Sequence, residues 1–163
     1  MVSVADKAPT HRVCIARGVV HMEAETLRLL VDGRLPKGDV LTTARLAGIQ
    51  AAKRTADWIP LAHPLPLDVV EIVLVPDAKG SCVHVEARTE AHARTGVEME
   101  ALVAVAAAGL TLYDMCKAVD RTLRLDDVRL VRKSGGKGGD WSRPGERALP
   151  RPEAASPRPR PRR

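Results

Sequence analysis

The chain has very few aromatic residues. Its 163 residues include no Phe, one Tyr (Tyr113) and two Trp (Trp58 and Trp141). Modules that bind single-stranded nucleic acid commonly stack bases on aromatic side chains, so this composition argues against a specific nucleic-acid partner. The core must be built mainly from Val, Leu, Ile and Ala, and a chain of this length can bury one in a single domain.

Cysteine is also scarce. The three cysteines, at positions 14, 82 and 116, form no CxxC pair, which argues against a disulfide framework and against a zinc site. The N-terminus has no apolar segment typical of a signal peptide, and the apolar stretch 101–112 is too short to span a membrane. We therefore expect a cytoplasmic protein without a membrane partner, a bound metal or a cofactor.

Positive charge is concentrated at the C-terminus. The net charge is +6, and residues 143–163 alone carry seven Arg, two Glu and six of the twelve prolines. Such a segment cannot bury apolar surface, so the sequence predicts a folded domain over 1–142 and a disordered Arg/Pro-rich tail over 143–163. A non-catalytic nucleotide- or nucleic-acid-binding module that uses this basic tail is one possible function.

The hydrophobic pattern predicts an α+β protein. The sequence favours the order β-α-α-β-β-α-β, which is typical of a ferredoxin-like fold with a four-stranded antiparallel sheet and helices packed on one face. Strands are predicted at 12–22, 67–75, 81–91 and 123–131. Helices are predicted at 23–31, from an N-cap at Asp39 to about residue 57, and at 96–119. Three prolines make 59–66 an irregular loop.

The long predicted helix at 96–119 carries four ionisable residues among apolar ones, namely Glu98, Glu100, Asp114 and Lys117. Asp114 and Lys117 are three residues apart and are therefore neighbours on a helix surface. This pair can form an acid–base couple with shifted pKa values, or a plain surface ion pair. Glu100 and Asp114 lie within roughly 40° of each other around the helix but about 21 Å apart along it. One small ligand cannot touch both from one helix, so the ligand is long or two subunits share the site.

Three further positions are candidates for ligand binding. Lys37 precedes a predicted helix N-terminus, which suits a phosphate, although Pro-Lys-Gly-Asp is also an ordinary turn. His63 lies in the proline-rich loop, where a rigid backbone could hold it for proton transfer, or where it could simply pack. Lys133 begins a basic, glycine-rich loop that either approaches a ligand or connects to the tail.

Several motifs of the chain resemble those of the cyclic pyranopterin monophosphate synthase family (molybdenum cofactor biosynthesis protein C). The resemblance covers roughly residues 1–141. The motifs are Lys37-Gly38-Asp39-Val40, the segment 44–55, Ile59-Pro60-Leu61-Ala62-His63-Pro64-Leu65, the segments 96–102 and 112–119, and Lys133-Ser134-Gly135-Gly136-Lys137.

The resemblance implies a lyase of molybdenum cofactor biosynthesis. It implies conversion of (8S)-3′,8-cyclo-7,8-dihydroguanosine 5′-triphosphate to cyclic pyranopterin monophosphate and diphosphate, in a homohexamer built as a trimer of dimers with active sites at dimer interfaces. The catalytic positions that it implies are Asp114, Lys117, Lys37 and Lys133. The substrate-binding positions are Leu61, Ala62, His63, Glu98, Met99 and Glu100.

The chain departs from the family pattern at two places. The family often has Cys where this chain has Ala62, so a backbone contact could persist at that position but a thiol role could not. The tail lies beyond the motifs, and the resemblance implies nothing about it.

Overall fold

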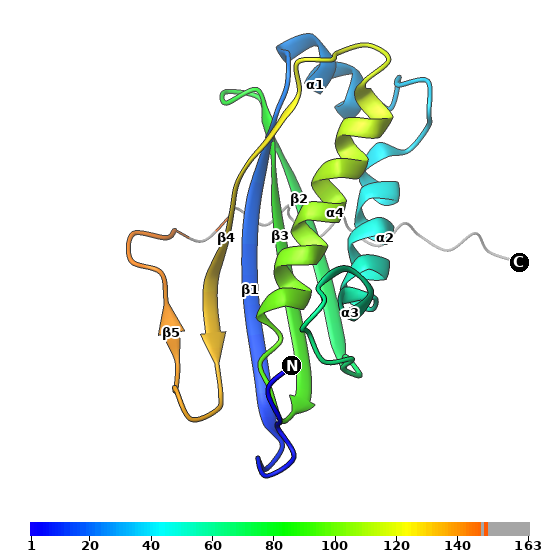
Figure 1. The fold of residues 1–163 in the computed structure, drawn as a ribbon. Coiled ribbons are helices and arrows are strands. Elements are labelled where there is room, and N and C mark those ends of the chain that lie inside the picture. The colour runs from blue at the N-terminus through cyan, green and yellow to red at the C-terminus, as the bar shows by residue number, and fades with distance from the viewer. Residues whose placement is uncertain (148, 150–163) are drawn as a thin grey trace, which may run out of the picture.

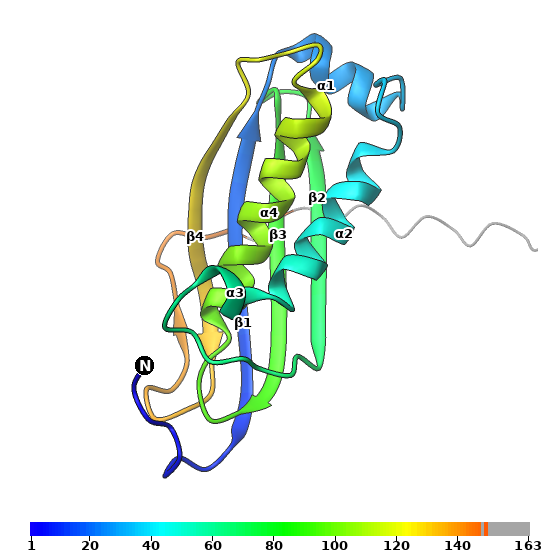
Figure 2. The same cartoon turned by 45° about the vertical axis from the view of Figure 1, so that its right-hand side comes forward.

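The structure is a computed structural model that describes residues 1–147 and 149. Helices cover one face of an antiparallel sheet, and the other face is free of helices (Figures 1 and 2). The elements in chain order are β1 (Thr10–His21), α1 (Ala24–Val31), α2 (Val40–Ala52), α3 (Thr55–Trp58), β2 (Val69–Asp77), β3 (Cys82–Ala93), α4 (Glu98–Cys116), β4 (Arg124–Ser134) and β5 (Trp141–Ser142).

The sheet has the strand order β2-β3-β1-β4-β5, with every neighbouring pair antiparallel. Its first four strands have the ferredoxin-like arrangement that the sequence predicted, and the α+β class is confirmed. The predicted strand number is corrected from four to five, because Trp141 and Ser142 pair with Lys133 and Arg132 at the edge of the sheet. This two-residue strand is too short to give a periodic signal in the sequence.

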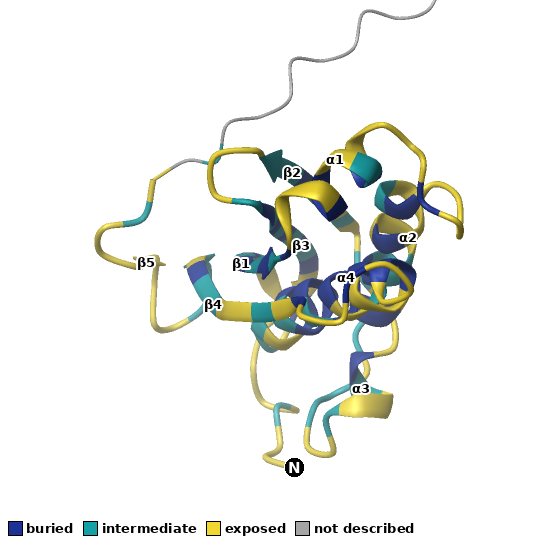
Figure 3. Cartoon of the chain, turned by 90° about the horizontal axis from the view of Figure 1, so that it is seen from above, coloured by how far each residue is buried: buried dark blue, intermediate teal, exposed yellow. Residues whose placement is uncertain are grey.

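Small aliphatic residues fill the space between the sheet and the helices. In β3, Val83, Val85 and Ala87 are fully buried and alternate with partly exposed residues, so one face of the strand points into the core. Figure 3 shows the same contrast for the helices, whose inner sides are buried. Helices α2 and α4 pack closely, since a Cβ atom at Gly48 would lie 3.0 Å from the carbonyl oxygen of Ala104. A core without Phe is thus compatible with tight packing.

Helix α2 begins as predicted and ends earlier than predicted. The Asp39 side chain accepts a hydrogen bond from the Thr42 N–H at 3.0 Å and caps the helix. The helix stops at Ala52 rather than near residue 57, and α3 adds a separate turn. At the break, the buried Thr55 hydroxyl donates to the Ala52 carbonyl at 3.0 Å, an interaction that competes with regular helix hydrogen bonding.

Helix α4 is the central helix of the protein. It spans 19 residues and is apolar enough to cross a membrane by length and composition, in contrast to the expectation from the shorter stretch 101–112. In the fold it lies over the middle of the sheet and beside α2 (Figures 1 and 2), and 61% of its apolar window is buried. Such burial is typical of the core helix of a globular domain.

The C-terminal segment continues to contact the sheet after β5. The Arg143 N–H donates to the Val131 carbonyl at 2.8 Å. Glu146 then accepts from Arg17 at 3.0 Å and also pairs with Arg129. Ordered contacts therefore run past the domain boundary predicted at residue 142. The predicted disorder of the tail concerns mainly residues outside the described ones and stays a prediction.

Candidate functional site

Asp114 and two lysines form a compact charged group at the C-terminal end of α4. Lys117 Nζ lies 2.7 Å from Asp114 Oδ1, and Lys37 Nζ lies 2.6 Å from Asp114 Oδ2. Lys37 also donates to the Asp114 carbonyl at 2.9 Å. The loop before α2 and the last turn of α4 come together here, so residues far apart in the sequence are in direct contact. All three side chains remain accessible to a ligand.

The two ammonium groups determine the protonation state of this group. Hydrogen bonds from Lys117 and then Lys37 lower the pKa of Asp114 to about 2. The same carboxylate raises the pKa of Lys117. At neutral pH Asp114 is therefore a carboxylate that can accept a proton, and Lys117 is an ammonium that can donate one. The contact is thus an ion pair at neutral pH, with the negative charge on Asp114 and the proton on Lys117.

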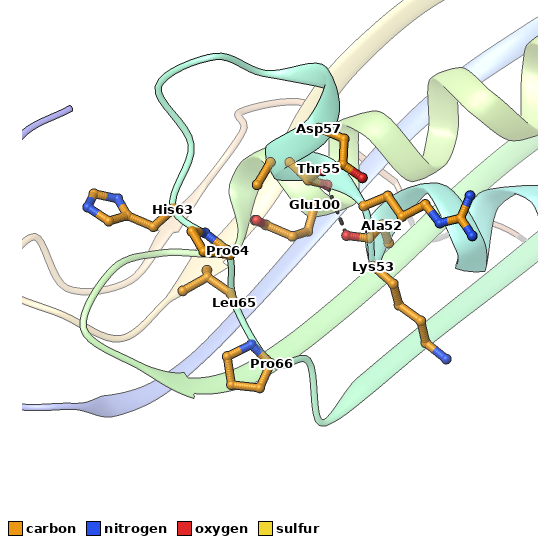
Figure 4. Close-up of a pocket in the computed structure, with 11 residues that line it drawn as sticks. Ala52, Lys53, Thr55, Asp57, His63, Pro64, Leu65, Pro66 and Glu100 are labelled. Atoms are coloured by element: carbon orange, nitrogen blue, oxygen red, sulfur yellow. Dashed lines mark hydrogen bonds between the residues drawn. The ribbon is translucent and has the colours of Figure 1, made fainter.

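Glu100 lies at the opposite end of α4, in its first turn. Its side chain is 4% exposed, and this burial raises the pKa of the carboxyl group. It lines a cavity of about 340 Å³ together with the segment 52–57 and the loop 63–66. Figure 4 shows Glu100 between the chain that carries His63 and Pro64 and the helix end that carries Thr55. A buried carboxyl group that opens into a cavity is suited to ligand recognition.

A second cavity, of about 290 Å³, adjoins the first. Both are lined by His63, Leu65 and Glu100. The complete lining of the second cavity is Ile59, Leu61, Ala62, His63, Leu65, Thr95, Gly96, Glu98, Met99 and Glu100. The second cavity therefore brings together all six positions that the family resemblance implies for substrate binding, although they come from two segments more than thirty residues apart.

Lys133 lies beside the second cavity and not in the Asp114 group. Its Nζ lies 3.5 Å from Glu98 Oε1. The glycines that follow it allow the chain to approach Arg12, because a Cβ atom at Gly136 would lie 1.8 Å from an Arg12 guanidinium nitrogen. Within one chain, the four predicted catalytic residues therefore form two separate groups. Lys133 lies beside the second cavity, and Asp114, Lys117 and Lys37 lie at the C-terminal end of α4.

Sequence reasoning missed Arg12. Its Nε atom is buried and has no hydrogen-bond partner among the described residues, which is unusual for a buried polar group. Alternation in β1 places Arg12 on the same side as the buried Cys14 and Ala16. A charged residue on the core-facing side of a strand was the signal that could have identified it.

Two buried thiols, those of Cys14 and Cys116, have raised pKa values. Burial, followed by the Glu98 charge, raises the pKa of Cys14 to about 12. Burial, followed by the Asp120 charge, raises the pKa of Cys116 to about 11. Both are protonated at neutral pH and cannot supply a thiolate. In residues 1–147 and 149, the one cluster of three potential metal ligands is Asp77, Cys82 and His84, which lies at the β2–β3 turn outside both groups.

Comparison with known proteins identifies relatives over most of the chain. The family model described as "MoaC family" matches residues 1–136. The cyclic pyranopterin monophosphate synthase of Chloroflexus aurantiacus is 56% identical over 144 residues, which are 88% of each chain. The proteins with the same name from Thermomicrobium roseum and Dinoroseobacter shibae are 55% identical over 148 residues and 58% identical over 139 residues. These alignments cover 91% and 85% of this chain and 89% and 88% of the respective relatives.

Proposed function

The chain belongs to the MoaC family, and from this premise we propose that it is a cyclic pyranopterin monophosphate synthase, a lyase of molybdenum cofactor biosynthesis. Its substrate is (8S)-3′,8-cyclo-7,8-dihydroguanosine 5′-triphosphate, and its products are cyclic pyranopterin monophosphate and diphosphate. The observation that carries the proposal is the Asp114 carboxylate held between the ammonium groups of Lys37 and Lys117. The relatives give no support to a non-catalytic module that binds through the basic tail.

Proton transfer is the first task of this group. Rearrangement of a guanine ring into a pterin moves protons between carbon- and nitrogen-bound positions, which requires an acid and a base in contact with the substrate. The low pKa of Asp114 keeps its carboxylate unprotonated at neutral pH, so this group is the proton acceptor, and Lys117, which is an ammonium at that pH, is the donor. Since the pair shares hydrogen bonds, its two titrations are coupled.

Release of diphosphate is the second task. Closure of the cyclic phosphate forms a bond between a sugar oxygen and the α-phosphorus and breaks the bond from that phosphorus to the diphosphate oxygen. Negative charge then accumulates on the leaving group, where cationic groups stabilise it. Lys37 and Lys133 supply these charges, and Arg12 adds a guanidinium next to Gly136, in the loop that follows Lys133.

The complete site requires two subunits. Asp114 and Glu100 lie 14 residues apart on one helix, about 21 Å along its axis, which exceeds the reach of one reacting centre. A twofold axis brings the Asp114 group of one chain to the cavities around Glu100 in its partner. A groove of about 430 Å³ between α2 and α4 supports such a contact, because the exposed Trp58 and Leu110 line it. The full assembly is a homohexamer formed as a trimer of dimers.

We also propose that the protein is cytoplasmic. All three cysteines are free, and buried free thiols are typical of proteins from a reducing compartment.

Turnover of the cyclic substrate tests the proposal. The purified full chain is incubated with (8S)-3′,8-cyclo-7,8-dihydroguanosine 5′-triphosphate, and cyclic pyranopterin monophosphate and diphosphate are quantified separately. Equal amounts of the two products, formed over many turnovers per chain, are expected. Binding of the substrate without product formation would contradict the catalytic function and favour the nucleotide-binding alternative.

A further inference from the structure

The turn between β2 and β3 brings together an Asp, a Cys and a His that the proposed reaction does not use. Asp77 ends β2, and Cys82 begins β3 as its pairing partner in the sheet. His84 follows two residues later, so its side chain lies on the same side of β3 as Cys82. One donor atom from each side chain lies within 4.8 Å of the other two.

We propose that Asp77, Cys82 and His84 form a binding site for a divalent transition-metal ion, Zn²⁺ by the chemistry of these ligands, with a fourth position open to water. Thiolate, imidazole and carboxylate are the three side-chain ligands that Zn²⁺ uses in proteins. The proposal goes beyond the synthase function and replaces the expectation from cysteine spacing that the protein binds no metal.

The two distances from His84 to the other ligand atoms are close to those of a tetrahedral site. His84 Nε2 lies 3.7 Å from Cys82 Sγ and 3.6 Å from Asp77 Oδ2. With the usual zinc–ligand bond lengths, a tetrahedron has an S–N edge of about 3.6 Å and an N–O edge of about 3.4 Å. Small side-chain movements would bring His84 Nε2 to these separations from the other two atoms, which lie within 4.8 Å of each other.

The surrounding turn orients the carboxylate. Asp77 Oδ1 accepts hydrogen bonds from the backbone N–H groups of Lys79 at 2.9 Å and Gly80 at 3.2 Å. These bonds fix one oxygen and leave Oδ2 directed toward His84, which is how outer-shell partners hold a carboxylate ligand.

Gly80 leaves room for the ion. A Cβ atom at this position would lie 2.9 Å from Asp77 Oδ2 and 3.1 Å from Cys82 Sγ. Any larger residue would therefore crowd the oxygen and sulfur atoms that have to reach the ion. The sequence alone could not reveal the site, because strand pairing and not sequence spacing brings Asp77 to Cys82.

Metal binding has to displace the thiol proton. Cys82 is 3% exposed, and burial and the Asp77 charge raise the pKa of its thiol. A bound dication reverses this effect and deprotonates a coordinating thiol. Binding then forms a metal–sulfur bond and releases the Cys82 proton to solvent, while neutral His84 donates its Nε2 lone pair.

Cobalt substitution tests the site. The untagged full chain, stripped with a chelator and reduced, is titrated with Co²⁺ and in parallel with Zn²⁺. We expect one ion per chain, a thiolate-to-cobalt charge-transfer absorption, and a higher melting temperature with Zn²⁺. Cys82→Ser loses the charge-transfer band, and His84→Gln binds at least about tenfold more weakly. Gly80→Ala keeps every ligand but crowds the ion, and it also binds at least about tenfold more weakly.

Cys116→Ser is the matched control, because its thiol is buried in the core away from this turn. It should retain both the band and the stoichiometry. Absence of stoichiometric binding by the folded wild-type chain would overturn the proposal. So would a charge-transfer band that survives in Cys82→Ser or disappears in Cys116→Ser.

Discussion

Asp114 is the residue on which the proposed chemistry depends most. Replacement by Asn preserves the shape of the side chain but removes its ability to accept a proton, and it leaves the two lysines without their shared carboxylate. We expect Asp114→Asn to lower kcat by at least about 10²-fold, the usual contribution of a positioned acid or base. Product formation by the purified variant, compared with wild type at saturating substrate, measures the effect.

Asp32→Asn is the control for this variant, because Asp32 is an exposed carboxylate that pairs only loosely with Arg28, at 3.6 Å. Its kcat should equal that of wild type. A kcat within about tenfold of wild type for Asp114→Asn would exclude Asp114 as the main acid or base. Since the pKa of Asp114 is about 2, this group should contribute no acid limb to kcat/KM between pH 5 and 8.

Glu100 couples protein stability to pH. Burial raises the pKa of its carboxyl group in the folded state, so the folded protein favours the protonated form. The contribution of Glu100 to stability is fully present below the unfolded pKa and is lost as the pH rises through the folded pKa. Glu100→Gln stays neutral, and we therefore expect it to melt at a higher temperature than wild type at pH 8.

Thermal melts of both proteins between pH 4 and pH 8 provide the measurement. The difference in melting temperature should shrink toward pH 4, where wild-type Glu100 is protonated. Glu71→Gln, at an exposed position of β2, should show no such trend. A Glu100→Gln variant that is less stable than wild type at every pH would mean that its ionised carboxylate is stabilised in the fold.

Glu146 provides the ion pairs that hold the C-terminal segment after β5 to the free face of the sheet. Glu146 pairs with Arg17, which is 8% exposed, and with Arg129. Each arginine retains another partner, Glu86 for Arg17 and Asp127 for Arg129. Loss of hydrogen bonds to charged groups in Glu146→Gln should therefore lower the unfolding free energy by about 1–3 kcal/mol.

Urea unfolding measures this change. Glu25→Gln is the comparison, because it breaks an exposed ion pair with Arg28 and should change stability by less than about 1 kcal/mol. Equal stability of Glu146→Gln and wild type would show that the segment does not contribute to the folded state in solution.

The tail beyond this segment should be dispensable for catalysis. A chain that ends at Leu149 keeps Glu146 and removes residues 150–163, which carry five Arg, one Glu and five prolines. Its kcat/KM should lie within about twofold of wild type, and its weak, salt-sensitive binding to polyanions should fall. A chain that ends at Ser142 should instead lose stability, because it also removes Glu146. A loss of more than about tenfold in kcat/KM for the longer chain would place the tail at the active site.

Two inactive variants should restore activity when mixed, if the site is shared between subunits. Each dimer of Glu100→Ala with Asp114→Asn contains one site with both residues intact. After free exchange, mixing equal amounts should therefore recover about a quarter of the wild-type activity. Subunit exchange is verified by native mass spectrometry, and activity is measured on the same samples.

The control mixture combines Asp114→Asn with Lys117→Ala. Both residues lie at the same end of α4 and are in contact, so every mixed site lacks one of them and no recovery is expected. Failure of the first mixture despite verified exchange would contradict a shared site. Recovery in the second mixture would mean that Asp114 and Lys117 serve different sites.

The sequence predicted the four-stranded framework, the apolar helix α4 and the Asp39 cap because these features depend on local pattern. Alternation, helical spacing and capping act over a few residues and can be read directly. The end of α2 was predicted too late, because the hydrogen bond from Thr55 to Ala52 is not visible as a pattern. Strand β5 was missed, because its two residues are ordered only by pairing with β4.

The same distinction between local pattern and tertiary contact applies to the candidate site. The sequence by itself predicted Asp114, Lys117 and Glu100 as candidate site residues, together with the distance between the two ends of one helix. Only the tertiary structure decided that Lys37 contacts Asp114, that Lys133 contacts Glu98, and that Arg12 packs against the loop at Gly136. The proximity of Asp77 to Cys82 and His84 was likewise visible only in the tertiary structure. Sequence spacing determines which residues share a local element, whereas contacts between distant segments arise only when strands pair and helices pack.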